Sequence, residues 1–182
     1  MIAIYYTGAD SSGAAQLESN RSLGGYISGS AVPNDFLGNL FPSISQISQQ
    51  EGRTETRAIA IKNLSGQAFT SFDVYINPAD KENLATSWKI GYQQPVLDDC
   101  GDLISEVLPN AYSSPLNVVL NSGTGPNEKT ILPNIEANGY VILYIQRTVL
   151  KPIIDDDQLE IDWEDGKTQA TTEQIDLVFT YS

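Results

Sequence analysis

The absence of histidine limits the chemistry that this chain can perform. Its 182 residues contain no His and a single Cys, Cys100. Ser-His-Asp and Cys-His mechanisms need a histidine base, and structural zinc sites need several Cys or His ligands. The sequence therefore excludes these hydrolase mechanisms and the His-based zinc sites.

Paired carboxylates are the catalytic chemistry that the composition leaves open. A glycosidase needs only two carboxyl groups, held about 5 to 9.5 Å apart. The chain has 23 acidic residues, so neighbouring acids arise by chance and are interpreted here as ordinary surface charge. The candidates for a carboxylate pair are Asp98, Asp99, Asp102, Asp155, Asp156, Asp157, Glu160 and Asp162.

The densest acidic run, from residue 155 to 165, raises the question of a bound cation. Calcium takes about six to eight oxygen ligands, and the candidates in this run are Asp155, Asp157 and Asp162. Leu159 stands where an EF-hand loop needs an oxygen ligand, so that motif is absent. Alternating acids on a strand would share one solvent-facing side. We favour this solvated face, and we predict neither a metal nor another cofactor.

Residues 123–130 superficially resemble a phosphate-binding loop. That motif needs glycine directly before its lysine, so that successive N–H groups can surround the phosphate. Here Glu128 precedes Lys129 and brings the wrong charge. The segment is therefore predicted to be a solvated loop.

Aromatic side chains suggest a surface for stacking sugars. Strands are enriched in Tyr and Trp for packing alone, so the core or an interface is the preferred location. The aromatic candidates are Trp88, Tyr92, Tyr112, Tyr140, Tyr144 and Trp163.

Net charge and hydropathy narrow the possible partners. The formal charge of −13 repels a phosphate backbone, so nucleic acid is not an expected partner. No run approaches the roughly 18 apolar residues that span a bilayer, and the first residues lack the basic and apolar regions of a signal peptide. One cysteine fits folding in a reducing cytoplasm. Neither a membrane nor a secretory route is expected.

Hydrophobic periodicity predicts an all-β protein with an antiparallel β-sandwich, Ig-like or jelly-roll-like, over residues 51–182. Short alternating segments separated by turn residues are typical of such folds. Residues 97–108 could instead form one or two helical turns. The expected strands are 57–62, 72–76, 88–92, 116–120, 140–149, 159–163 and 175–181.

Residues 1–50 have a different pattern, with small apolar groups separated by Gly, Ser and Pro. Turn-forming residues argue against long strands, and the apolar anchors argue against a disordered tail. We expect an extended N-terminal arm that packs either on its own domain or on a neighbouring copy. The anchors expected at this interface are Leu23, Tyr26, Ile27, Phe36, Leu40 and Phe41.

Two resemblances follow from these segments. Residues 54–182 look like many Ig-like sandwich modules, through the strand ending at 62–66, its partner at 72–76 and the later strand entered from Gly139. The segment 22–34, followed by Leu37, Leu40 and Phe41, resembles the start of small virion proteins of tailed bacteriophages, particularly crAss-like phages. The second resemblance implies a ring, neck or head-decoration component present in many copies.

The sequence thus predicts a non-enzymatic structural subunit of a phage virion. It would be made in the host cytoplasm and would assemble with itself and with other virion proteins through its arm and its sheet edges. Two other classes remain open. They are a carbohydrate-binding or adhesion module, which needs exposed aromatic residues in a groove, and a glycoside hydrolase, which needs two acids facing each other across a cleft.

Overall fold

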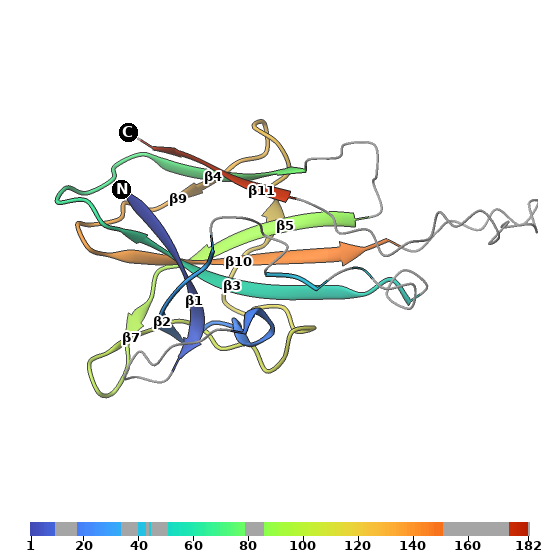
Figure 1. Ribbon diagram of the computed structural model, residues 1–182, viewed down its shortest axis with the longest axis horizontal. Coiled ribbons are helices and arrows are strands. Elements are labelled where there is room, and N and C mark those ends of the chain that lie inside the picture. Colours follow the sequence, from blue (N-terminus) through green and yellow to red (C-terminus); the bar gives the residue numbers. More distant parts are fainter. Residues whose placement is uncertain are drawn as a thin grey trace, which may run out of the picture.

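A six-stranded antiparallel sheet is the centre of the computed structural model (Figure 1). The structure describes residues 1–9, 18–33, 40–42, 44, 51–78, 86–150 and 175–181. The strand order is β2-β1-β3-β10-β5-β8. The strands are β1 (Ile2–Ala9), β2 (Tyr26–Ala31), β3 (Thr54–Asn63), β5 (Thr86–Gln93), β8 (Asn121–Ser122) and β10 (Tyr140–Val149).

A three-stranded antiparallel sheet packs on one face of this central sheet. It contains β4 (Phe72–Pro78), β9 (Thr130–Leu132) and β11 (Ile175–Tyr181) in the order β11-β4-β9. Alternate residues of β3, β4 and β10 point between the two sheets and form the main core, which includes Ile61, Val74 and Leu143. The two sheets therefore form an antiparallel β-sandwich, as the sequence predicts.

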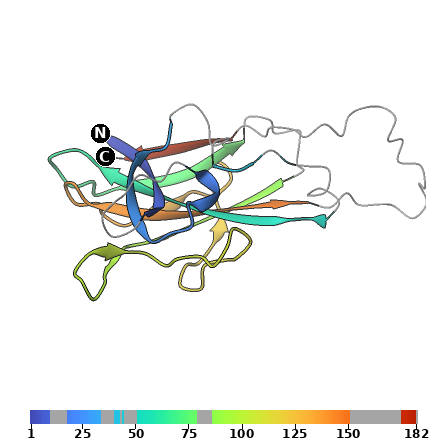
Figure 2. The same cartoon turned by 60° about the horizontal axis from the view of Figure 1, so that its bottom comes forward.

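Residues 94–120 cover the opposite face of the central sheet, and we call them the coil layer. Figure 2 shows this layer below the sandwich, in yellow-green. Its only regular parts are the two-residue strands β6 (Val96–Leu97) and β7 (Leu103–Ile104). Leu108 and Val118 of the layer pack with Ala58, Ile142 and other residues of the sheet in a second core. Burial on both faces explains why β3 and β10 are apolar on both faces.

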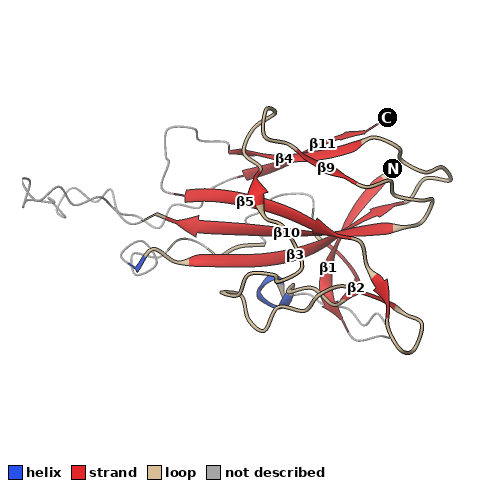
Figure 3. Cartoon of the chain, turned by 180° about the vertical axis from the view of Figure 1, so that it is seen from behind, coloured by secondary structure: helices blue, strands red, loops and turns tan. Residues whose placement is uncertain are grey.

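Five of the expected strands are confirmed, two of them (140–149 and 175–181) with the expected bounds and three with bounds that differ by up to three residues. They correspond to β3, β4, β5, β10 and β11. The expected strand at 159–163 lies outside the described residues. Strands and loops make up nearly all of the described chain (Figure 3). No helix in these residues is long and apolar enough to span a membrane.

Two predictions within the coil layer are wrong. Residues 97–108 form the β6–β7 hairpin and an extended segment instead of helical turns. Residues 116–120 are not a strand, and Leu116 and Val119 are 91% and 77% exposed. The carboxylate of Glu106 accepts hydrogen bonds from the backbone N–H groups of Leu116 and Asn117. These donors are therefore committed to a side chain and do not join a β-ladder.

The described parts of residues 1–50 belong to the domain and do not extend from it. β1 pairs with β3 from Ile2↔Asn63 to Tyr6↔Ile59, and β2 pairs with β1. Val32 packs against the main core. Of the two expected modes of packing, the structure contains the one on the chain's own domain.

Candidate functional site

Leu40, Phe41 and Ile44 are buried in the domain, and we call these three residues the core plug. They are 0%, 4% and 1% exposed. Leu40 and Phe41 belong to the main core, where Phe41 lies near the start of β3 and the end of β10. The ring of Phe41 meets Trp88 edge-on, with 5.4 Å between the ring centroids. Two guanidinium groups also lie beside that ring, with the Cζ of Arg57 at 5.5 Å and the Cζ of Arg147 at 5.0 Å from its centroid. Phe41 is thus held by both apolar and cation–π contacts.

A buried charge cluster lies beside Phe41 of the core plug. The Nη2 atom of Arg147 lies 2.7 Å from Oε2 of Glu55, which is its cross-strand neighbour. Arg57 lies on the same face of β3 as Glu55 and donates through Nη1 to the Thr56 carbonyl oxygen at 3.0 Å. Burial lowers the pKa of the Arg57 guanidinium, and the charge of Glu55 opposes that shift. The cluster therefore has two cationic groups and one anionic group, with Phe41 beside both cations.

The core plug corrects part of the predicted interface. Leu40 and Phe41, which we expected at a contact with a neighbouring subunit, are buried inside their own domain. The sequence alone does not distinguish an anchor that packs on its own domain from one that packs on a partner. Both kinds look the same in the sequence, as an apolar residue among turn-forming residues. Phe36 lies outside the described residues.

The remaining predicted interface residues lie next to the coil layer. Leu23 and Ile27 are partly buried against the second core. The hydroxyl of Tyr26 donates a 2.5 Å hydrogen bond to Oδ2 of Asp98 in the β6–β7 hairpin. This bond raises the pKa of Tyr26 to about 12 and lowers the pKa of Asp98. Leu23 and Ile27 therefore contact the second core, and Tyr26 contacts the β6–β7 hairpin of the coil layer.

Hydrogen bonds from several elements fix the coil layer on the sheet. The Tyr144 hydroxyl donates to the Glu106 carbonyl oxygen, and the Leu108 N–H donates to the Leu23 carbonyl oxygen at 2.8 Å. Gly24 has φ +94°, and a Cβ at this position would lie 1.9 Å from the Glu106 carbonyl oxygen. Only glycine permits this close approach of two backbones. The layer is thus a fixed part of the domain.

Several apolar side chains of this layer are exposed. Burial of an exposed apolar side chain of this size is favourable by about 1.5–3 kcal/mol. A group of exposed apolar side chains therefore favours contact with a partner molecule. Sequence reasoning missed this surface because the apolar residues of 116–120 look like a buried strand. We call it the apolar surface of the coil layer, and its members are Val96, Leu97, Leu103, Val107, Leu116 and Val119, which are 41–91% exposed.

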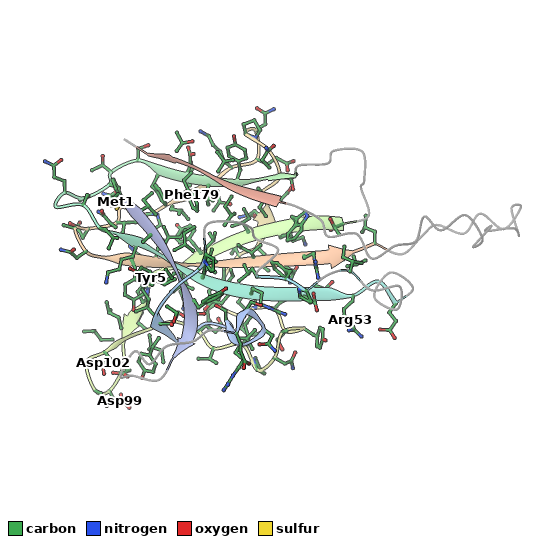
Figure 4. The ribbon with its side chains drawn as sticks, in the orientation of Figure 1. Met1, Tyr5, Arg53, Asp99, Asp102 and Phe179 are labelled. Carbon is green, nitrogen blue, oxygen red and sulfur yellow. The ribbon has the colours of Figure 1, made fainter. Side chains whose placement is uncertain are left out.

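Three of the acidic candidates, Asp98, Asp99 and Asp102, lie in the β6–β7 hairpin. The Asp98 carboxylate accepts hydrogen bonds from Tyr26 and from the N–H groups of Cys100 and Asp102, so it closes the hairpin turn. Asp99 and Asp102 are exposed at the hairpin. Figure 4 shows them at one end of the molecule and the cationic side chain of Arg53 at the other end. The other acidic candidates, including Asp155, Asp157 and Asp162, lie outside the described residues.

Polar side chains of the loop at 123–130 are engaged within the domain. Lys129 pairs with Asp73 at 2.7 Å, and the Glu128 carboxylate accepts a hydrogen bond from Ser122. The lysine is therefore engaged within the domain, as expected for a surface loop. In the described parts of the chain, no three Asp, Glu, Cys or His residues are grouped as metal ligands would be.

The aromatic candidates are divided between the core and the surface. Trp88 and Tyr144 are buried, and Tyr140 is partly buried. Tyr92 is 38% exposed on β5, whereas Tyr112 is 56% exposed on the coil layer, where its ring faces the Arg53 guanidinium at 5.1 Å. Trp163 lies outside the described residues. Three of the five aromatic candidates that the structure describes therefore pack within the domain.

Comparisons with protein-family models, with curated proteins and with solved structures found no match for this chain. The function must therefore be argued from the features of the molecule itself.

Proposed function

We propose that this protein is a non-enzymatic structural subunit of a tailed-phage virion. In this proposal it assembles in multiple copies as a ring, neck or head-associated component. The observation that carries the assembly part is the apolar surface of the coil layer, where Leu116 and Val119 are 91% and 77% exposed. Resemblance of residues 22–41 to small virion proteins supports the phage part. The lack of histidine supports a role without the commonest hydrolase chemistry.

The contact surface in this proposal differs from the arm expected from sequence. Leu40 and Phe41 occupy the core of their own domain, whereas the coil layer presents apolar side chains that are held in place by backbone and side-chain hydrogen bonds. A surface that is fixed before binding loses little conformational freedom when a partner docks. The coil layer is therefore the first surface to test.

Light scattering coupled to size exclusion tests the assembly. The purified chain is expected at a multiple of its 19.8 kDa mass. The double variant L116S/V119S should lower that mass. The matched control I131S removes another exposed apolar side chain, 73% exposed on β9, and should leave the mass unchanged. A wild-type chain that stays at 19.8 kDa at all concentrations would contradict the proposal.

Gene order tests the virion assignment separately. Genes for a portal, a capsid or a tail protein are expected beside the gene for this chain. A neighbourhood of sugar-metabolism genes would instead favour the carbohydrate-binding alternative.

A further inference from the structure

Strand β11 differs from the other strands at the edges of the two main sheets. An unprotected edge has free N–H and C=O groups that can pair with another chain, and proteins protect such edges by shortening or distorting them. β8 and β9 have only two and three residues, and the pairing of β2 with β1 contains two register shifts. β11 has seven residues, all in unbroken register with β4.

The free edge of β11 has no strand on it within the described residues, because the sheet order ends there. Its sequence, Ile-Asp-Leu-Val-Phe-Thr-Tyr, contains no proline, no glycine and no basic residue. Leu177 and Phe179 pack into the main core, and Val178 and Thr180 alternate onto the outer face. Such an edge is suited to accepting another strand.

We propose that β11 pairs with β11 of a second copy, antiparallel and centred on Val178. In this register all seven residues are paired, and Leu177 of one copy lies opposite Phe179 of the other. The two-fold symmetry gives two such Leu177–Phe179 pairs, and both continue the apolar face of the sheet. Position 176 falls opposite position 180, so Asp176 of one copy does not lie opposite Asp176 of the other copy. The self-complementary sequence makes a second copy the partner that fits.

The contact joins two three-stranded sheets into one continuous sheet of order β9-β4-β11-β11-β4-β9. It is isologous, because both copies use the same residues around a two-fold axis. This inference rests on the proposed function, since it names one contact of the multi-copy assembly. A single cyclic ring joins its subunits by head-to-tail contacts, with all subunits in the same orientation about the ring axis. An isologous two-fold contact does not fit such a ring. Within the proposed function, the contact therefore favours a head-associated position.

Disulfide trapping tests this register directly. Directly opposed residues of an antiparallel pair have Cα atoms about 4.5–5.5 Å apart, which is within disulfide range. In a C100S background, which removes the native thiol, V178C should form a covalent dimer on mild oxidation. T180C is the matched control on the same face of the same strand. Its two copies are offset by four residues, or roughly 13 Å, so it should stay largely monomeric in a denaturing gel.

Light scattering on the C100S parent and on charge variants separates this inference from the proposed function. V178K places two ammonium groups opposite each other and should lower the assembled mass, whereas T180K places each one opposite position 176 and should not. A parent that is always monomeric would contradict both proposals. A parent that assembles, with V178C and T180C cross-linking equally or not at all, would overturn only the β11 contact.

Discussion

Replacing Phe41 with alanine tests the packing that most changes the interpretation of residues 1–50. The side chain is 4% exposed and lies against Trp88 and two guanidinium groups. Truncation of a buried phenylalanine typically costs about 3–5 kcal/mol, from the lost burial and from the cavity that remains. We therefore expect F41A to lower the free energy of unfolding by about 4 kcal/mol, which is a large part of the roughly 5–15 kcal/mol typical of a domain.

The variant F41L separates the ring from its volume. Leucine keeps most of the apolar burial but loses the aromatic pair, worth about 0.5–1.5 kcal/mol, and two cation–π contacts of about 0.5–1 kcal/mol each. F41L should therefore cost about 2 kcal/mol, or half the effect of F41A. Leu64, which is 40% exposed, supplies the control, since L64A should change stability by less than about 0.5 kcal/mol.

Urea unfolding followed by far-ultraviolet circular dichroism measures these differences by linear extrapolation. A loss below about 1 kcal/mol for F41A would refute the reasoning, because a seated phenylalanine cannot be removed so cheaply. Equal losses for F41A and F41L would retain the burial but reject the contribution of the ring.

Three further predictions concern buried groups. E55Q should cost more than R147M in urea unfolding, by about 1–3 kcal/mol, because E55Q leaves two buried cations whereas R147M leaves one charge of each sign; equal losses would contradict the charge account. Burial raises the pKa of Tyr144 to about 12, and a tyrosine in the unfolded chain ionises near pH 10, so the unfolded state loses its proton first and stability falls between these pH values. Y144F should reduce that fall in unfolding curves taken at pH 9 to 12, and an unchanged slope would contradict it. G24A should cost at least about 2 kcal/mol because of its backbone clash, whereas G125A, with φ +87° and open space around it, should cost about 1 kcal/mol; similar losses in urea would mean that the clash is relieved.

The sequence predicts the sandwich strands well because their signal is local. Alternation in Phe72, Val74 and Ile76, and the long apolar run of β10, reflect burial on one and two faces of a strand. The coil layer cannot be predicted in this way. Its order depends on contacts distant in sequence, such as Ser105 with Gly25, and on the Glu106 carboxylate that holds the segment after Pro115.

The candidate contact surfaces were less predictable than the fold. Leu40 and Leu116 are the same residue type beside turn-forming neighbours, yet one is fully buried and the other is 91% exposed. Only the three-dimensional arrangement distinguishes them, because burial depends on what the rest of the chain leaves uncovered. The edge character of β11 also depends on the strand order, which periodicity does not determine.

The pairing of β3 with β10 has a consequence for the synthesis of this protein. These central strands join residues 54–63 to residues 140–149, so the core of the sheet needs contacts between distant parts of the chain. Strand pairing over long sequence separations slows folding, since loop closure must precede the contacts that stabilise it. On the ribosome, β5 and β8 also emerge before β10, but they reach β3 only through β10, so β3 has β1 as its one ladder partner among the described strands until β10 is made. The central sheet therefore cannot join β3 to β5 until residues 140–149 have emerged.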